Sequence, residues 1–254
     1  MSQDIRDTKG LSQLYHLNSE PWVNEVPGGA PQYLHRAKPR PGAPLIALPP
    51  TAESALDTWA NARRSTRAFD PRALHLSDLA RVLRSGYRAL GPDPIGGGQT
   101  ILRRPVPSAG GLYSLEIYAL VQNVTGLSSG IYAYDPVGDG LLTLSTDAWQ
   151  DDAAAAFLSW SSVSSAPVLI CIAAVFERTQ AKYGPRGYRY VLMEAGHVGQ
   201  MLSLSAETAG LSTLFLGGFH DTRLNTLLGL DGVEEAVVYA MALGHAIAAE
   251  HPPT

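Results

Sequence analysis

Pro167-Val-Leu-Ile-Cys-Ile-Ala-Ala-Val175 is the stretch of sequence that decides the fold. A short, continuous apolar run rich in β-branched residues is typical of a strand buried on both faces, and it predicts a central strand over residues 166–175. Residues 188–210 follow without a proline. They place one apolar stripe at helical spacing and so predict the longest core helix of the chain, with Val191, Ala195, Val198, Leu202 and Ser205 on the stripe.

Further strands and helices alternate on both sides of this pair. The pattern predicts strands over 115–124, 130–135, 213–216 and 236–243, and helices from 52 into the arginines at 63–67, after a cap at Ser77, over 151–160 and over 221–228. Glycines and prolines at 91–98 predict a flexible surface loop. Residues 1–50 are rich in proline and glycine and lack periodicity. We therefore expect an extended arm over 1–50 and a single domain over 51–254.

Bulk composition excludes several classes of protein. Of the 254 residues, 45% are hydrophobic and 17% charged, which is typical of a globular protein. The formal net charge of −4 argues against a nucleic-acid binder. The single cysteine, Cys171, excludes an intrachain disulfide and a multi-cysteine zinc site, and its apolar surroundings indicate a buried structural thiol. No signal-peptide pattern or bilayer-spanning run is present, so we expect a cytoplasmic protein that does not bind membranes.

Residues 63–67, Arg63-Arg-Ser-Thr-Arg67, concentrate three guanidiniums and two hydroxyls, and we call them the arginine segment. Arginine pairs bidentately with phosphate oxygens, and serine or threonine hydroxyls can donate to the same anion. One interpretation is therefore a fixed phosphate site for a phosphorylated cofactor. The other is a solvated basic surface that binds nothing, and the segment alone does not decide between them.

Two stretches of small residues could leave room for a flat ligand. Gly217-Gly218 follows a predicted strand, and Pro107-Ser-Ala-Gly-Gly111 precedes another. Each is compatible with an ordinary turn, and no Gly-x-Gly-x-x-Gly turn supports a dinucleotide site. Glu194 and His197 share one helix face, but the further ligands of a di-iron site are missing. The spacing instead predicts a buried hydrogen-bonded pair between these two residues and no metal site.

Lys182-Tyr183 lies in a basic and aromatic segment just before the long helix. An amine and a phenol can act as general base and acid in proton transfer. The alternative is a surface lysine beside a packing tyrosine, which the pair alone would favour.

Four separated motifs together resemble the nitroreductase-like flavoproteins, and within them the SagB-type azoline dehydrogenases of thiazole- and oxazole-forming peptide pathways. The motifs are Leu14-Tyr-His-Leu-Asn-Ser19, the arginine segment, Pro107-Ser-Ala-Gly-Gly-Leu-Tyr113 and Glu194-Ala-Gly-His-Val-Gly-Gln200. The resemblance runs from about Leu14 to His245. It implies an α+β fold with a central, mostly antiparallel sheet flanked by helices, and a homodimer with its active sites at the interface.

The resemblance also implies a role for each candidate residue. Arg63, Arg64, Ser65 and Arg67 would hold FMN, with the backbone N–H groups of Gly217 and Gly218 facing its ring. Three departures from the family pattern are visible: His245 stands where many relatives have a phosphate-binding arginine, Met201 where many have asparagine, and Ser114 where many have proline. The residues expected to line the ring, in the partner subunit's site, are Pro107, Ser108, Ala109 and Gly110.

The implied reaction is the oxidation of a thiazoline or oxazoline ring to the azole, in a peptide or a carrier-tethered substrate. Lys182 or Tyr183 would accept the proton, FMN the hydride equivalent, and dioxygen would reoxidise the flavin. A cyclodehydratase or synthetase is the expected partner protein. Two alternatives stay open: an NAD(P)H-dependent nitro- or quinone reductase, and a non-catalytic scaffold subunit of a cyclodehydratase complex.

Overall fold

An antiparallel sheet of seven strands forms the centre of the computed structural model, which describes residues 9–20, 41–96 and 98–247. The strand order is β1-β11-β9-β5-β7-β8, and β10 also pairs with β11. The long apolar strand β9 lies between β11 and β5, as its composition predicts. The strands are β1 (Phe69–Asp70), β5 (Leu115–Val121), β7 (Gly130–Asp135), β8 (Gly140–Ser145), β9 (Val168–Val175), β10 (Ser212–Leu216) and β11 (Glu235–Ala246).

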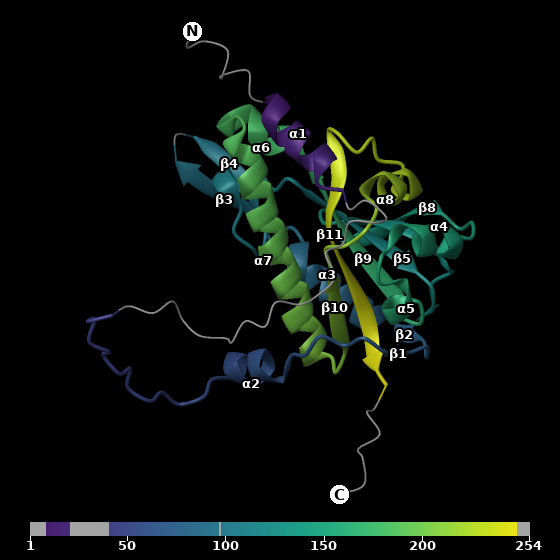
Figure 1. The fold of residues 1–254 in the computed structure, drawn as a ribbon, viewed down its shortest axis with the longest axis horizontal. Helices are drawn as coiled ribbons and strands as arrows, with labels where there is room; N and C mark the ends of the chain where they lie inside the picture. The colour runs from purple at the N-terminus through teal and green to yellow at the C-terminus, as the bar shows by residue number, and fades with distance from the viewer. Residues whose placement is uncertain (1–8, 21–40, 97, 248–254) are drawn as a thin grey trace, which may run out of the picture.

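Helices cover both faces of this sheet (Figure 1). α3 and α7 pack on one face, while α4, α5 and α8 pack on the other. The α+β fold with a flanked antiparallel sheet is therefore confirmed. The helices are α1 (Lys9–Asn18), α2 (Ala55–Ala62), α3 (Leu76–Tyr87), α4 (Gln150–Ala156), α5 (Trp160–Val163), α6 (Phe176–Tyr183), α7 (Arg186–Thr208) and α8 (Asp221–Leu228), with a 3-10 turn, η1, at Ala109–Gly111.

Strand β9 divides its side chains between two cores because successive residues point to opposite faces of a sheet. Ile170 and Ile172 pack with α3 and α7. Leu169 and Cys171 pack with α4, α5 and α8. Burial raises the pKa of the Cys171 thiol to about 12, so this cysteine is the inert, buried residue that the sequence predicts.

Helix α7 determines how far apart the candidate residues lie. Its 23 residues correspond to a length of about 35 Å at 1.5 Å per residue. α6 lies at its N-terminal end and α2 near its C-terminal end (Figure 1). The segments that follow α2 and end α6 are therefore held at opposite ends of one long helix.

The stretch 91–98 is not the loop that its glycines and prolines predict. β3 (Gly91–Gly96) pairs with β4 (Gln99–Arg103) in a two-stranded antiparallel hairpin. The outer edge of each strand in an isolated hairpin makes no ladder hydrogen bonds. A proline whose nitrogen faces that edge therefore costs the hairpin no hydrogen bond. The cap predicted at Ser77 is also wrong, because α3 begins at Leu76 and His75 occupies its N-cap.

The N-terminal arm is only partly extended. α1 forms a helix where none was predicted, and the His16 ring packs edge-on against Phe176 and Tyr188. Residues 41–54, by contrast, form neither helix nor strand. The predicted arm at 1–8 and 21–40 lies outside the described residues. Strand β8, helix α6 and the short parallel pair β2 (Leu74–His75) and β6 (Val124–Thr125) were also missed. Within the described part of the chain, no helix combines the length and apolar character needed to cross a bilayer.

Candidate active site

The third motif, residues 107–113, forms a tight turn that we call the motif loop. Gly110 and Gly111 have φ of 65° and 66°, and Tyr113 has φ of 47°, so the chain passes through the left-handed region three times. Ser108 ties the turn together, because its Oγ accepts the Tyr113 N–H at 2.9 Å and its carbonyl accepts the Gly111 N–H at 3.1 Å.

Glu194 of α7 lies beneath this loop and joins it to α3. The Ser108 hydroxyl donates to Glu194 Oε2 at 2.5 Å, and the Tyr87 hydroxyl donates to Glu194 Oε1 at 2.9 Å. Burial raises the pKa of the Glu194 carboxyl, while the hydrogen bonds from Ser108 and Tyr87 oppose that rise. The Arg104 guanidinium lies 4.0 Å from the centre of the Tyr87 ring and extends the network.

The predicted pair between Glu194 and His197 is wrong. His197 is exposed, whereas Glu194 is buried and bonded to residues of two other segments. Two side chains three residues apart on a helix point in similar but not identical directions. Here Glu194 is buried in the core, whereas His197 faces outward. Among the described residues, no cluster of three histidine, cysteine or acidic side chains is arranged to hold a metal.

Lys182 and Tyr183, at the end of α6, lie against the motif loop. A Cβ atom built on Gly110 would be 2.7 Å from Tyr183 Oη and 2.9 Å from Lys182 Nζ. The Lys182 Nζ is 5.3 Å from the Tyr183 ring centre, and Tyr190 packs edge-on against the same ring at 5.2 Å. The structure thus brings the predicted catalytic pair together with Gly110 and, through Ser108, with Glu194.

The arginine segment lies at the other end of α7. Ser65 forms a bridge with Thr213 at the start of β10, and the Thr66 N–H donates to the Thr213 carbonyl at 3.0 Å. The Arg64 guanidinium donates to the backbone carbonyls of Asn61 and Arg63. Of the described carboxylates, none lies within 4.0 Å of a guanidinium of this segment. These donors are therefore largely available to an external anion.

His245 lies near the arginine segment, because the next-but-one residue, Ile247, donates its N–H to the Ala68 carbonyl, and other charged residues surround it. It pairs with Asp70 across β1 and β11. Burial, and then the nearby Arg72, lower the pKa of the His245 imidazole, while Asp70 and Asp78 oppose that shift. The imidazole is therefore neutral at pH 7 and cannot replace the fixed charge of an arginine.

Gly217 and Gly218 follow the opposite end of β10. No atom lies within 4 Å of a Cβ built on Gly217, which is exposed. The Gly218 carbonyl accepts the Leu158 N–H at 3.3 Å. The open side of Gly217 provides the space a planar ring would need, and five strand residues, about 17 Å, separate these glycines from the arginine segment. The available guanidiniums and this open backbone together fit a cofactor with a phosphate at one end and a ring at the other.

A single chain therefore does not assemble all the predicted residues into one site. Lys182, Tyr183 and the motif loop form one group beside Glu194, and the arginine segment lies beside Glu207, thirteen residues or about 20 Å further along α7. Sequence reasoning also missed Tyr87 and Arg104. Tyr87 was assigned only to a helix core, and nothing in its spacing indicates a bond to a residue 107 positions away.

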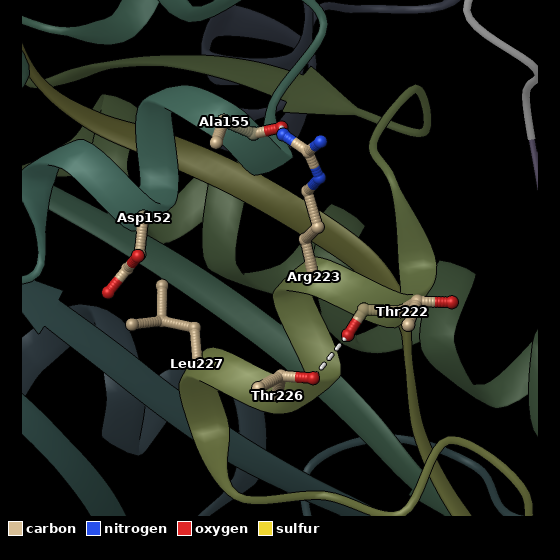
Figure 2. Close-up of a pocket in the computed structure, with 6 residues that line it drawn as sticks. All are labelled: Asp152, Ala155, Thr222, Arg223, Thr226 and Leu227. Carbon is tan, nitrogen blue, oxygen red and sulfur yellow. Dashed lines mark hydrogen bonds between the residues drawn. The ribbon is translucent and has the colours of Figure 1, made fainter.

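Two surface cavities were compared with these groups. One of about 510 Å³ lies between α4 and α8, where Arg223 reaches across to the Ala155 carbonyl at 3.1 Å (Figure 2). None of the predicted site residues lines it. Another of about 480 Å³ borders the motif loop at Gly111, Leu112 and Tyr113, and the ion pair between Arg178 and Glu116 lines it too. Only the second cavity is continuous with a predicted site.

Comparison with known proteins assigns the chain to a family. Residues 60–245 match the model of the nitroreductase family. The chain is 35% identical over 204 residues to the nitroreductase-like protein MJ1384 of Methanocaldococcus jannaschii, covering 80% of this chain and 96% of the relative. It is 29% identical over 173 residues to the microcin B17-processing protein McbC of Escherichia coli, covering 64% of this chain and 59% of McbC.

A solved structure extends the match in fold. The chain superimposes on a protein of the E. coli microcin synthetase McbBCD complex, with truncated pro-MccB17 bound, at a TM-score of 0.73 and 22% identity. The match covers 95% of this chain and 94% of that one. Together with the McbC relative, it supports the subgroup that the four motifs indicate. The chain belongs to the nitroreductase family and is an oxidoreductase with the nitroreductase fold.

Proposed function

We propose that this protein is an FMN-dependent dehydrogenase that oxidises a thiazoline or oxazoline ring to the azole, in a peptide or a carrier-tethered substrate. The observation that carries the proposal is the convergence of Lys182 Nζ and Tyr183 Oη on Gly110 of the motif loop. A reductase that accepts diverse oxidants has no need for a substrate base at this position. The relative named as a microcin B17-processing protein supports a peptide substrate.

The arginine segment and Gly217 are the parts of the chain that would hold FMN. Arg63 and Arg67 offer guanidiniums and Ser65 a hydroxyl for the phosphate and ribityl groups. Arg64 already donates to two carbonyls, so we assign it a smaller share of the phosphate. When bound, FMN supplies an acceptor for two electrons and a proton equivalent from the substrate.

Lys182 and Tyr183 perform the proton transfer in this proposal. Aromatisation removes a proton from one ring carbon and a hydride equivalent from its neighbour. Either the Lys182 amine in its neutral form accepts the proton, or the Tyr183 phenolate accepts it while Lys182 donates a hydrogen bond to the phenolate oxygen. The Tyr190 ring packed against Tyr183 restricts the phenol to one orientation.

We infer that two copies of the chain complete each site. Thirteen residues of α7, about 20 Å, separate Glu194, which holds the motif loop beside the catalytic pair, from Glu207, which lies beside Arg63 and Arg64, so the two groups do not adjoin in a single chain. A second copy would bring its motif loop to the first copy's arginine segment. Leu45, Ile46 and Leu48 are 95%, 83% and 89% exposed, and α2 buries none of its side chains, so this part of the arm has apolar surface for a partner to cover.

Mass loss provides the direct test of the reaction. The FMN-loaded protein is incubated with a thiazoline-containing peptide, and the product is expected to be lighter by about 2 Da, the mass of two hydrogens. Light scattering is expected to give twice the 27.1 kDa of one chain. Unchanged peptide mass under aerobic conditions, with FMN bound, would contradict the proposed reaction.

A nitro- or quinone reductase fed by NAD(P)H is the second candidate, and the 35% identity to a nitroreductase-like protein favours it. Steady NAD(P)H oxidation with quinones, faster than azoline turnover, would identify this activity.

The fold match to a chain of a synthetase complex also supports a cyclodehydratase partner. Stimulation of azole formation by an added cyclodehydratase is the corresponding test, and a colourless protein that cannot be loaded with FMN would instead indicate a scaffold subunit.

A further inference from the structure

We propose that Glu194 is a positioning residue, whose carboxylate fixes the motif loop and, through Gly110, the places of Lys182 and Tyr183. The inference rests on the proposed function for the roles of Lys182 and Tyr183. It concerns a side chain that has no hydrogen bond to either of them and that bonds instead to Tyr87 and Ser108.

The directions of the hydrogen bonds define what Glu194 does. The Tyr87 and Ser108 hydroxyl oxygens each accept a backbone N–H, from Leu115 at 3.0 Å and from Tyr113 at 2.9 Å. Their own hydrogens are directed to the two oxygens of Glu194. A carboxylate that accepts at both oxygens holds both hydroxyls in one orientation, which a protonated carboxyl or an amide cannot do equally well.

The motif loop needs this support because its backbone is strained. Tyr113 is not a glycine and yet has φ of 47°, a left-handed conformation that is unfavourable for a residue with a Cβ atom. The Ser108 Oγ accepts the N–H of this residue while donating to Glu194. Loss of the carboxylate would free the Ser108 hydroxyl to rotate, and the bond to the Tyr113 N–H would no longer be fixed.

Gly110 transmits the position of the loop to the catalytic pair. Its missing side chain allows the backbone to approach Tyr183 Oη and Lys182 Nζ so closely that a Cβ would be within 2.9 Å of both. α6 is in turn fixed on α7, where a Cβ at Gly187 would be 2.9 Å from the Gln180 backbone. The end of α6 therefore lies between the start of α7 and the loop that Glu194 holds, and a shift of that loop changes where the two side chains can rest.

Three variants test the inference. Glu194→Gln keeps the shape of the side chain and replaces one of its two acceptor oxygens with an amide group. Ser108→Ala removes the hydroxyl that donates to Glu194, and because Ser108 is only half-buried, this variant is less at risk of misfolding. Ser205→Ala is the matched control, because Ser205 is a buried serine on the same helix that donates instead to the Arg81 carbonyl. All three are prepared as the full chain loaded with FMN, and bound FMN is measured from its absorbance.

Hydrogen exchange gives a readout that needs no substrate. In Glu194→Gln and Ser108→Ala, peptides covering 108–114 and 177–184 are expected to exchange about tenfold faster than in the wild type, while Ser205→Ala leaves both unchanged. The kcat for azoline oxidation is expected to fall about 10- to 100-fold with KM within about twofold, since groups are displaced rather than removed. The double variant should be no slower than Glu194→Gln.

The outcomes separate this inference from the proposed function. Unchanged exchange in both peptides of Glu194→Gln and Ser108→Ala would overturn the positioning role, whatever the substrate. Faster loop exchange with an unchanged kcat would overturn it too, because Glu194 would then serve only stability. Absence of azoline oxidation by the wild type would contradict the proposed function, while the exchange data would still decide whether Glu194 holds the loop and the end of α6.

Discussion

In the N-terminal half of α7, Glu194 accepts hydrogen bonds from Tyr87 and Ser108, and the motif loop lies against Lys182 and Tyr183. At its C-terminal end, the arginine segment presents guanidiniums that no described carboxylate pairs. The first region is organised by side-chain hydrogen bonds within one chain, whereas in the second the Arg64 guanidinium donates only to backbone carbonyls. Glu207 lies near Arg63 and Arg64 but forms no ion pair with either, and because clustered guanidiniums repel one another, we expect an anion to complete the second region.

Removal of the proton acceptor should have the largest effect. Lys182→Ala is expected to lower azoline turnover by about 10²- to 10⁴-fold, the range of general-base catalysis, with FMN retained. Arg186→Ala, an exposed cation at the start of α7, serves as the control and should keep turnover within about twofold. Wild-type turnover in Lys182→Ala would exclude Lys182 as the proton acceptor.

Loss of one guanidinium tests the open end. Arg63→Ala removes hydrogen bonds to a charged phosphate, worth about 1.5–3 kcal/mol, so the Kd for FMN should rise about 10- to 100-fold and the flavin should be lost on dialysis. Arg189→Ala removes the same charge at the opposite end of α7 and should retain FMN. Full flavin occupancy in dialysed Arg63→Ala would show that this end is an ordinary basic surface.

The arm tests whether the two ends meet across a dimer. Replacing Leu45, Ile46 and Leu48 together by serine removes apolar surface that one chain leaves exposed. We expect the dissociation constant of the dimer to rise about tenfold or more. Azoline turnover should fall in parallel at low protein concentration. Sedimentation across a dilution series measures both species. A variant that stays dimeric at every concentration tested would remove the arm from the interface.

A smaller effect should follow from a single methyl group at the organised end. Gly110→Ala and Gly126→Ala both place an alanine at positive φ, so each should cost about 1–2 kcal/mol of stability in urea unfolding. Only the methyl at 110 meets Tyr183 and Lys182, because no atom lies near a Cβ at 126. A fall in turnover confined to Gly110→Ala would sharpen the comparison, and equal losses in the two variants would reduce it to backbone strain.

The smallest effect concerns pH at the open end. Because the pKa of His245 is lowered from its ordinary value of 6.5, the imidazole gains its charge only as the pH falls below that value. If His245 contacts the FMN phosphate, its gained charge should partly preserve the affinity for FMN at low pH. As the pH falls from 7 to 5, the affinity of the wild type should therefore fall about two- to fivefold less than that of His245→Gln. Fluorescence titration of FMN at both pH values gives the ratio. Parallel curves would place His245 outside the phosphate site.

Periodicity was enough to predict the elements that carry their own pattern. β9 and α7 bury long apolar runs, and α8 was predicted with the bounds that it has. The hairpin at 91–103 and helix α1 were missed because their residues are stabilised by contacts with distant segments rather than by a local pattern. Ile101 of the hairpin packs over Gly111, and His16 of α1 packs on Phe176 and Tyr188.

By itself, the sequence determined the family, the central strand and the long helix, and it identified the chemistry of arginines, glycines and a Lys-Tyr pair, because these depend on residue types at short spacing. Only the tertiary structure decided which side chains contact one another. It bonded Glu194 to Tyr87 and Ser108 instead of His197, and it set the arginine segment and the catalytic pair at opposite ends of α7. Hydrogen bonds between residues about a hundred positions apart cannot be predicted from the spacing of neighbouring residues, because they depend on how the whole chain between the two residues folds.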